Sequence, residues 1–358
     1  MEKMKLKELI NVRTGKLDAN VSSENGKYPF FTCSKETLKI NTYSYDCECV
    51  LLAGNGDLNV KYYNGKFDAY QRTYILECKN EIISTKYLYY FMKKYLKILR
   101  NQSIGGVIKY IKLANISEAI IPIYSKEEQE EIVNNISKVE EVLNIKNKQI
   151  KELNNLIKSQ FVEMFGNIKI YERLSDYSIL ITKGASPKWQ GINYKRKGTL
   201  FITSENVREG YIDISKPKYL ENKINEILPR SILRKEDILI NIVGASIGRA
   251  AKYNYEYLAN INQAVALVRT KNINNIFLLT YLNSEQAIKM YNDMKKGGAR
   301  ENLSLKNISD LKIPKATLAL QNQFSEIVKQ IDKQKFEIEK SLKATQELYE
   351  SLMEKYFG

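Results

Sequence analysis

The sequence predicts an α+β protein in which two mixed α/β domains are each followed by one long helix. Three observations lead to this fold class. The last part of each half of the chain repeats at a fixed offset of 192 residues. Two stretches without Gly or Pro carry apolar side chains in a heptad pattern. The segments before them are short, rich in β-branched and aromatic residues, and interrupted by Gly, Asn and Pro, which is typical of strands joined by turns.

The repeat is clearest just before each long helix. Residues 105–129 (GGVIKYIKLANISEAIIPIYSKEEQ) align without a gap with residues 297–321 (GGARENLSLKNISDLKIPKATLALQ). Gly-Gly, Asn-Ile-Ser, Ile-Pro and the final Gln coincide. The same offset joins SQFVEMFG at 159–166 to SLMEKYFG at 351–358. A match of this length indicates a duplicated unit, so we expect two copies of one architecture.

The domains before the repeated tails match more loosely. Four pairs of short segments resemble each other: Leu6–Leu9 and Leu174–Tyr177, Phe30–Ser34 and Leu200–Ser204, Val50–Gly54 and Ile238–Asn241, and Tyr70-Gln71 and Asn262-Gln263. We therefore predict a first domain at residues 1–125, a helix at 126–166, a second domain at 167–315 and a second helix at 316–358.

The helical stretches begin with a clear start signal. Ser125-Lys126-Glu127-Glu128 has the pattern of a capping box. A 4,3,4,3 spacing then selects one apolar face of each helix. In the first helix this seam is Ile132, Ile136, Val139, Leu143, Lys146, Ile150, Leu153, Ile157, Gln160 and Met164. In the second it is Phe324, Val328, Ile331, Lys335, Ile338, Leu342, Thr345, Tyr349, Leu352 and Tyr356. Such a seam favours helix-to-helix packing over docking of each helix on its own domain.

Charge is distributed unevenly along the chain. The formal net charge is +15 and the pI is about 9.3. Residues 1–125 carry +7 (19 basic, 12 acidic) and residues 167–315 carry +11 (25 basic, 14 acidic). The helical tails carry −2 at 126–166 and −1 at 316–358. We therefore expect an anionic partner, most simply nucleic acid, for the two domains and a different partner for the helices.

Several other classes of protein are disfavoured. The apolar runs are too short to span a bilayer, and the charged start MEKMKLKELI does not resemble a secretory signal, so a cytoplasmic location without a membrane partner is expected. The chain contains no histidine, which excludes His-based acid/base catalysis and His-containing zinc sites. The cysteines are Cys33, Cys47, Cys49 and Cys78. The spacing Cys47-x-Cys49 does not suit a zinc knuckle, so we interpret these as ordinary strand cysteines and expect no bound metal.

No catalytic motif is recognisable. The glycines at Gly54-Asn-Gly56 and Gly244–Gly248 fit neither a dinucleotide fingerprint nor a P-loop, and we interpret them as turns after strands. The chain lacks the Asn/Asp-Pro-Pro-aromatic signature of amino-methyltransferases and has no Pro-Asp dipeptide of the nuclease type. The sequence therefore predicts no catalytic residues.

Candidate DNA-contacting residues occur in both domains. Lys and Arg suit phosphates, while Arg, Asn and Gln can also make paired hydrogen bonds to base edges. The second domain is richer in them, and its candidates are Lys183, Ser186, Lys188, Trp189, Gln190, Asn193, Lys195, Arg196, Lys197 and Gln263. The first domain offers Lys61, Tyr63, Gln71 and Arg72. The bland alternatives are a solvated loop at 183–197 and purely structural hydrogen bonds for the two glutamines.

Together these features resemble the specificity subunit of type I restriction-modification systems over essentially the whole chain. Each domain opens with a short leader such as LKELINVRTGKLDAN and closes with a near-repeat such as NISEAIIPIYSKEEQEEI, followed by a helix with an aromatic-Gly end. No single motif is very specific, but the duplicated order is. The second leader, KGASPKWQ, departs from TGKLDAN in the first, so the two half-sites should differ.

The resemblance implies two pseudo-symmetric target-recognition domains joined by two antiparallel coiled-coil helices. It implies a non-catalytic subunit that recognises a split double-stranded DNA target and recruits two modification (methyltransferase) subunits. No cofactor is expected on this chain. The modification subunits would bring S-adenosylmethionine, and two restriction subunits, where a system has them, would add ATP- and Mg-dependent translocation and cleavage.

Two other classes stay open on the residues alone. One is a DNA enzyme with an unrecognised site, which predicts turnover by the isolated chain. The other is a coiled-coil scaffold whose basic domains bind RNA or an acidic protein, which predicts no preference for a split duplex sequence.

Overall fold

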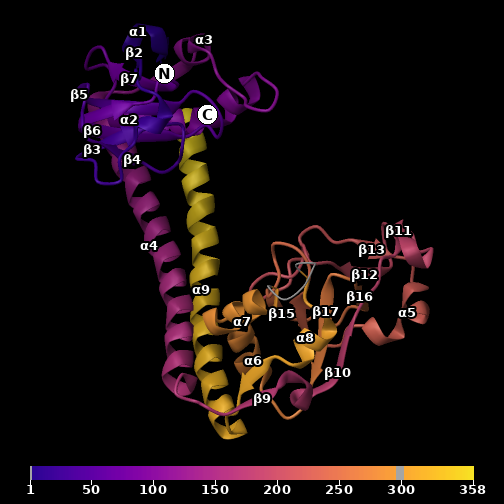
Figure 1. Cartoon of the computed structure of the whole chain (residues 1–358). Helices are drawn as coiled ribbons and strands as arrows, with labels where there is room; N and C mark the ends of the chain where they lie inside the picture. The colour runs from indigo at the N-terminus through magenta and orange to yellow at the C-terminus, as the bar shows by residue number, and fades with distance from the viewer. Residues whose placement is uncertain (1, 296–301) are drawn as a thin grey trace. The chain divides into compact units, whose positions relative to one another are not determined.

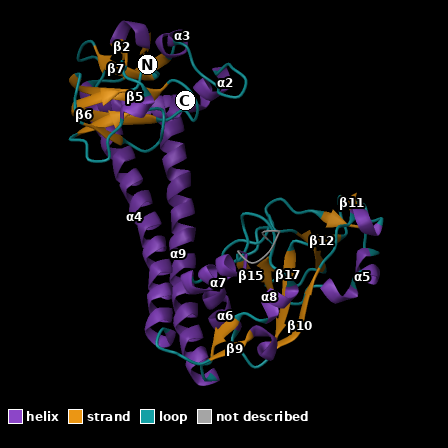
Figure 2. Ribbon diagram, viewed as in Figure 1, coloured by secondary structure: helices purple, strands orange, loops and turns teal. Residues whose placement is uncertain are grey.

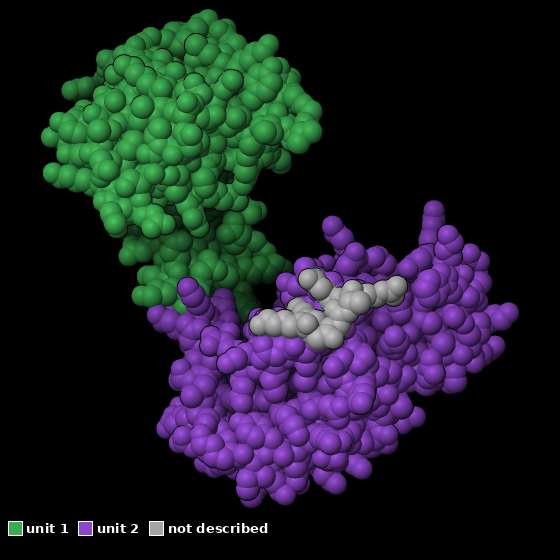
Figure 3. All heavy atoms as spheres, in the orientation of Figure 1, with its two compact units in different colours: residues 1–148, 339–358 green, residues 149–338 purple. Residues whose placement is uncertain are grey.

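The computed structural model describes residues 2–295 and 302–358, so the second Gly-Gly of the repeat, at 297–298, lies outside the described residues. The chain divides into two compact units. Unit 1 comprises residues 1–148 and 339–358, and unit 2 comprises residues 149–338 (Figure 3). Two 40-residue helices, α4 (Lys126–Phe165) and α9 (Leu318–Phe357), each contribute to both units.

Unit 1 is built on a six-stranded sheet with the order β2-β7-β5-β6-β3-β4. All its strand pairs are antiparallel except β3 with β6. The bounds are β2 (Ile10–Thr14), β3 (Tyr28–Phe31), β4 (Leu38–Ile40), β5 (Tyr45–Ala53), β6 (Val60–Ala69) and β7 (Thr73–Cys78). A separate pair joins β1 (Glu2–Lys5) to β8 (Ile120–Ile123), and the helical segments are α1 (Leu6–Leu9), η1 (Ala19–Val21), α2 (Thr85–Gln102) and α3 (Leu113–Ser117).

The strand β5 shows how the sequence positions this sheet. Side chains alternate between the two faces of a strand. Val50 and Leu52 join the core that includes α2, while Cys49 and Leu51 join a smaller cluster with Phe31 on the other face. Ser84 caps the start of α2, and its side chain accepts a hydrogen bond from the Tyr87 N–H. The cysteines of β5 are therefore packing residues, as predicted.

Unit 2 contains two four-stranded sheets, β10-β17-β14-β15 and β11-β13-β12-β16, and the pair β18-β9. Its strands are β9 (Tyr171–Arg173), β10 (Ser178–Lys183), β11 (Tyr194–Lys195), β12 (Thr199–Ile202), β13 (Tyr219–Leu220), β14 (Ile238–Asn241), β15 (Ala250–Lys252), β16 (Ala259–Ile261), β17 (Val265–Thr270) and β18 (Lys312–Pro314). Its helical segments are η2 (Leu174–Tyr177), η3 (Lys188–Gln190), α5 (Ile224–Ile227), η4 (Pro229–Ser231), α6 (Asn275–Leu282), α7 (Glu285–Lys295) and α8 (Leu305–Ser309).

The structure confirms the duplication element by element. At the offset of 192, α3 becomes α8, α4 becomes α9 and β7 becomes β17, with identical bounds in each case. β8 becomes β18, and the partners of these two strands, β1 and β9, occupy equivalent places. The parallel pair β3–β6 of unit 1 has its counterpart in β12–β16 of unit 2. The predicted α+β class with two related domains is therefore confirmed.

The long helices pack against each other in antiparallel order within each unit. In unit 1, Ile132 and Ile136 near the start of α4 share a core with Met353 and Phe357 at the end of α9. Figure 1 shows these two helix ends side by side. Farther along α4, the Lys146 Nζ donates to the Ser341 Oγ at 2.7 Å. In unit 2, the end of α4 packs on the start of α9 in the same way. Every side chain of the two predicted seams is buried or half-buried.

The seam shifts by one residue at the end of each helix. The predicted positions Gln160 and Met164 are only half-buried, whereas Phe161 and Phe165 are buried, with 7% and 2% exposure. The same shift occurs at Met353 and Phe357. The cause is a second partner, because the last turns also dock on a globular core. The expectation of helix-to-helix packing alone was therefore incomplete.

The two Phe-Gly ends belong to opposite domains. Phe165 packs on Phe277 of α6 in unit 2, with ring centroids 4.7 Å apart. Phe357 packs on Tyr87 of α2 in unit 1, with centroids 5.2 Å apart. Each helix thus leaves the domain that precedes it in the chain and ends in the core of the other domain. The repeated phenylalanine, Phe165 or Phe357, therefore fixes the end of each long helix in the core of the other domain.

The glutamines that coincide in the repeat hold a helix start in each unit. The Gln129 Oε1 accepts from the Ser84 N–H at 2.9 Å, and its Nε2 donates to the Ile82 and Tyr124 carbonyls. The Gln321 Oε1 accepts from the Asn274 N–H at 2.8 Å. Both side chains are almost fully buried, so these bonds satisfy polar groups that water cannot reach.

Candidate nucleic-acid interface

Three turns meet at one edge of the unit 1 sheet, at the carboxyl ends of β2 and β5 and the start of β7. The Gly15 N–H donates to the Thr73 carbonyl at 3.0 Å, and the Gly54 N–H donates to the Arg72 carbonyl at 2.8 Å. A Cβ on Gly15 would lie 2.2 Å from the Ala69 carbonyl oxygen, so only glycine permits this approach. The predicted turn at Gly54–Gly56 is confirmed, and it forms part of this edge.

Two of the four candidates in unit 1 lie on this edge with exposed side chains. Gln71 is exposed, and its Nε2 donates to the Asp18 Oδ1 at 2.9 Å. Arg72 next to it is exposed as well. Exchanging the bond to Asp18 for a base edge is chemically simple for Gln71, because an amide offers both a donor and an acceptor.

The other two candidates of unit 1 are engaged within the fold. The Lys61 Nζ donates to the Ser34 carbonyl at 2.7 Å, and burial lowers the pKa of this lysine. The Tyr63 ring packs against Phe31 and Phe67 with centroids 5.1 and 5.6 Å apart. Lys61 and Tyr63 therefore already have partners within the fold. The side chains of Gln71 and Arg72 are less engaged in such contacts.

Unit 2 builds an equivalent edge from the turns after β10, β12 and β14 and the turn before β17. A Cβ on Gly184 would lie 1.7 Å from the Ile261 carbonyl oxygen, which repeats the close approach made by Gly15. The buried Asn241 side chain ties two of the turns together, because its Nδ2 donates to the Ser204 carbonyl and to the Ser246 Oγ, both at 3.0 Å. The Ile242 N–H adds a bond to the Ala264 carbonyl.

This edge carries three predicted candidates and two that sequence reasoning missed. Lys183 and Gln263 are exposed here, and Ser186 is half-buried. Ser246 and the exposed Arg249 lie in the turn after β14. The glycine pattern at Gly244–Gly248 indicates only a turn. The sequence signal for these two residues was their position, with a serine inside a glycine-bounded turn and an arginine directly after it. This turn occupies the same place in unit 2 as Gly54–Gly56 does in unit 1.

The remaining candidates of unit 2 form a separate group on the second sheet. η3 ends at Gly191 in the left-handed conformation, with φ at 65°, and leaves Trp189 82% exposed. β11 follows and pairs with β13. Its neighbours Arg196 and Lys197 are exposed, and the group also contains Lys188, Gln190 and Asn193. The 183–197 loop is thus divided between two places rather than forming one surface.

Within that group, Lys195 is partly neutralised. Its Nζ lies 3.2 Å from a Glu221 carboxylate oxygen, to which the Asn193 Nδ2 also donates at 3.4 Å. Hydrogen bonds from Lys195 and Asn193 hold the pKa of Glu221 below its usual range. An exposed pair of this kind is weak, so Lys195 can still exchange its partner for a phosphate.

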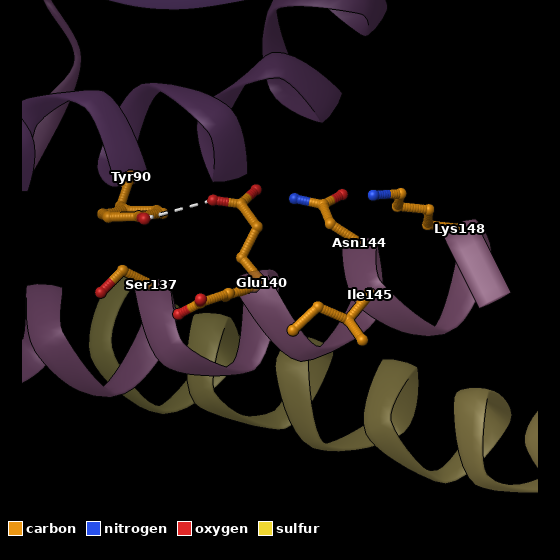
Figure 4. Close-up of a pocket in the computed structure, with 7 residues that line it drawn as sticks. Tyr90, Ser137, Glu140, Asn144, Ile145 and Lys148 are labelled. Atoms are coloured by element: carbon orange, nitrogen blue, oxygen red, sulfur yellow. Dashed lines mark hydrogen bonds between the residues drawn. The ribbon is translucent and has the colours of Figure 1, made fainter.

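The outer face of α4 is hollowed next to α2. A cavity of about 350 Å³ is lined by Tyr90, Ser137, Glu140, Glu141, Asn144, Ile145 and Lys148 (Figure 4). The Tyr90 hydroxyl donates to Glu140, and Lys93 forms an ion pair with the same carboxylate. The Lys93 Nζ also lies 5.6 Å from the Tyr349 ring centroid. These contacts join α2, α4 and α9 in unit 1. The Glu140 carboxylate therefore has a structural role.

The described part of the chain places no metal-binding cluster beside these edges. Among residues 2–295 and 302–358, no group of three or more Cys, Asp or Glu side chains could hold a metal ion. Burial raises the pKa of the Cys47 and Cys78 thiols, which favours their protonated form. No helix of the described chain is long and apolar enough to cross a membrane. Each of the two edges exposes at least one basic side chain and one glutamine.

Comparison with known proteins gives these edges a family context. The model of the type I restriction modification DNA specificity domain matches residues 1–155 and 190–348. The chain belongs to this family. The two matched regions correspond to the two copies of the duplicated frame, by which we mean the strands and helices that recur in both units.

Curated relatives agree. A segment of 126 residues, 35% of this chain, is 42% identical to the type I restriction enzyme EcoDI specificity subunit of Escherichia coli, and it spans 28% of that protein. The MjaVIII specificity subunit of Methanocaldococcus jannaschii is 24% identical over 82% of this chain and 76% of its own length. The EcoBI specificity subunit of Escherichia coli is 21% identical over 80% of this chain and 68% of its own length.

Solved structures show the same fold. The type I system S subunit of M. genitalium superimposes with a TM-score of 0.63 at 18% identity, covering 100% of this chain and 96% of that one. A chain from a study of type I R-M complex assembly and conformational transition gives a TM-score of 0.59 at 17% identity, covering 99% and 97%. The frame and its duplication are thus those of specificity subunits.

Proposed function

We propose that this chain recognises a split duplex DNA target within a type I restriction-modification complex, with each unit binding one part of the target. The observation that supports it best is the duplication of a whole frame around two different edges. Gln71 and Gln263 stand at matching places of the two edges, but Arg72 accompanies the glutamine in unit 1, whereas Ser246 and Arg249 accompany it in unit 2. Two edges in one frame with different side chains suit two half-sites of different sequence.

Charge supports duplex DNA as the partner of both edges. The excess of basic residues is confined to the two domain segments, at +7 and +11, while the helices are slightly acidic. Phosphate contacts position a protein on the duplex, and amide and guanidinium groups then distinguish bases. Both kinds of side chain lie at the edges described above.

The helices are the proposed docking site for two modification subunits. Outside the seam, α4 and α9 expose a leucine at equivalent positions, Leu156 at 44% and Leu348 at 50%. Two copies of one exposed apolar anchor suit two copies of one partner. In this proposal the chain itself is not an enzyme. Partner subunits supply S-adenosylmethionine, and restriction subunits supply the ATP- and Mg-dependent steps.

The direct test maps methylated adenines in the host genome with and without this gene. We expect a set of bipartite sites that loses methylation when the gene is deleted. The purified chain should transfer no methyl group to DNA by itself. Unchanged methylation, or turnover by the chain free of partners, contradicts the proposal.

A sharper test uses the helices as a spacer. One heptad is inserted into each long helix at the boundary between the units, after residues 148 and 338, so that both seams stay in register. Each insertion adds about 10.5 Å of helix. At about 3.4 Å per base pair this corresponds to up to roughly three more base pairs of spacer, or one to two if the helices are tilted.

The measurement is methylation by the reconstituted complex on targets whose spacers vary by single base pairs. We expect the preferred spacer to lengthen while both half-site sequences stay the same. A lengthened protein that still prefers the original spacer shows that the helices do not set the distance between half-sites.

A further inference from the structure

The loop between α2 and α3, residues 103–112, leaves two neighbouring aliphatic side chains uncovered. Val107 is 104% exposed and Ile108 is 63% exposed, and neither joins a core cluster. Figure 2 shows this loop projecting from the body of unit 1. Folding gains nothing from side chains that stay in water. An uncovered apolar pair at a loop tip therefore points to binding.

The tip is held in a defined shape. Ile104 and Tyr110 exchange both backbone hydrogen bonds, at 3.0 and 2.8 Å, and so close a tight hairpin around residues 105–109. Gly105 has a φ of +117°, and a Cβ at this position would lie 2.6 Å from the Ile108 carbonyl oxygen. The hairpin presents Val107 and Ile108 at its end with little ordering left to do on binding.

The base of the hairpin is attached to the candidate DNA-binding edge of unit 1. The Gly56 N–H donates to the Lys109 carbonyl at 2.8 Å, and the Ile111 N–H donates to the Gly54 carbonyl at 3.0 Å. Gly54 in turn bonds to the Arg72 carbonyl. The apolar tip therefore extends from the same strand ends that carry Gln71 and Arg72.

The surroundings of the tip favour DNA over a protein as its partner. Residues 101–117 contain no Asp or Glu, and both Lys109 on the hairpin and Lys112 just after it are exposed. Proteins that bend duplex DNA commonly insert aliphatic side chains between base steps in the minor groove, with basic residues on the adjacent phosphates. An apolar tip beside two lysines has this composition.

We propose that Val107 and Ile108 form a wedge that unstacks one base step at the part of the target bound by unit 1. Lys109 and Lys112 contact the flanking phosphates. The inference rests on the proposed function, because it needs duplex DNA on this edge. It adds distortion of the DNA, and therefore sequence preference through the ease of unstacking, to the direct contacts of Gln71 and Arg72.

The test uses the full chain in the reconstituted modification complex and target DNA that carries 2-aminopurine at successive positions other than the methylated adenines, because a methyltransferase extrudes its own target base. With the wild-type chain we expect a several-fold fluorescence increase at one step of the unit 1 half-site. Val107→Ser/Ile108→Ser should abolish this increase and weaken binding roughly tenfold, because the serines cannot replace the apolar packing against the bases. The salt dependence should stay the same, since both lysines that bind phosphate are still present.

Matched variants separate the wedge from general effects. Val107→Leu/Ile108→Leu should keep the fluorescence increase. Ile170→Ser/Ile179→Ser removes two aliphatic side chains that are 66% and 68% exposed in unit 2, and should leave it unchanged. A serine variant that still unstacks the step overturns the wedge. So does a serine variant that binds DNA normally but no longer assembles with modification subunits, because that result assigns the loop to a protein partner.

The outcomes also distinguish the wedge from the function on which it rests. A wild-type complex that prefers a split target but unstacks no step contradicts the wedge alone. A wild-type complex with no preference for any split target contradicts the proposed function, and the wedge with it.

Discussion

Units 1 and 2 use one frame in two ways. The strand β6 of unit 1 runs unbroken from Val60 to Ala69, whereas the same place in unit 2 is divided between β15 and β16, with residues 253–258 between them. The parallel pairing at the end of this strand is nevertheless kept, as Phe31 with Ala69 and Ile202 with Ile261. The frame tolerates large changes in the strands attached to it because its own packing is repeated. In unit 1 it consists of β7, α2 and the long helices, and in unit 2 of β17, α6 and the long helices.

The comparison also shows what the frame requires. Each copy needs an aromatic at the end of a long helix and a buried glutamine at its start, and these are residues that coincide at the offset of 192. The edges need only backbone turns of fixed shape, which Gly15 and Gly184 provide. Side chains at the edges are therefore free to differ, as expected if they determine which bases are bound.

The largest expected effect is a loss of stability, and it tests whether each long helix ends in the core of the other domain. Phe165→Ala should destabilise unit 2 by about 3–5 kcal/mol, and Phe357→Ala should destabilise unit 1 by a similar amount, because each ring is buried in a core. Hydrogen exchange locates the damage: protection should fall in α6 for Phe165→Ala and in α2 for Phe357→Ala. Loss of protection in the domain that precedes the mutated helix contradicts the crossing.

A smaller effect is expected for the glutamines. Gln129→Ala and Gln321→Ala leave the Ser84 and Asn274 N–H groups without their partners, which should cost about 1–3 kcal/mol each in urea unfolding. Gln129 should be the costlier of the two, since its Nε2 donates to two carbonyls, whereas that of Gln321 donates to one, at Ala316. The control is Gln160→Ala on α4, whose half-buried side chain bonds to the exposed Glu163 and should change stability by less than about 0.5 kcal/mol.

Sequence patterns predicted the frame well because periodicity and repetition are local signals. The heptad seam, the capping box at Ser125 and the offset of 192 each follow from residues that are close in sequence or repeated. The docking of Phe161 and Phe165 was missed because it depends on a core built from distant residues, including Phe277 of α6.

The binding edges were harder to predict for a related reason. Lys61 and Tyr63 are candidates for DNA contact by residue type, and no sequence pattern shows that the strands around them also supply a carbonyl and two aromatic rings as partners. Ser246 and Arg249 resemble parts of a turn, and only the meeting of several turns shows them at an edge. The exposed tip at Val107 carried no signal at all, since valine and isoleucine in a sequence normally indicate a core.

The basic group of unit 2 offers a milder test of how the two units share the DNA. Changing Lys188, Lys195, Arg196 and Lys197 to Ala should weaken DNA binding and reduce the slope of log affinity against log salt by about 0.9 for each phosphate that is no longer bound. Lys195 should contribute least, because Glu221 already pairs with it. The control changes Lys329, Lys333 and Lys343 on α9 to Ala. An unchanged slope in the first variant places these residues off the DNA path.

The smallest expected effect concerns a buried polar position that the two units fill differently. Asn260 of β16 is well partnered: its Oδ1 accepts from the Ser231 Oγ at 2.7 Å and from the Ile261 N–H at 2.9 Å, and its Nδ2 also donates. Asp68, at the matching place on β6, is equally buried. Its Oδ2 accepts from the Thr42 Oγ1 at 3.3 Å, and its Oδ1 has no hydrogen-bond partner among the described residues.

Asp68→Asn should therefore stabilise unit 1 by about 1 kcal/mol, because a poorly partnered acidic group costs more to bury than an amide. The reverse exchange, Asn260→Asp, should destabilise unit 2, since it removes the donors that now reach Asn225 and Leu228. Urea unfolding of both variants gives the two signs directly. If Asp68→Asn instead destabilises unit 1, the aspartate has a partner that its twin in unit 2 does not need, and the unit 1 edge beside Ala69 is the place to look for it.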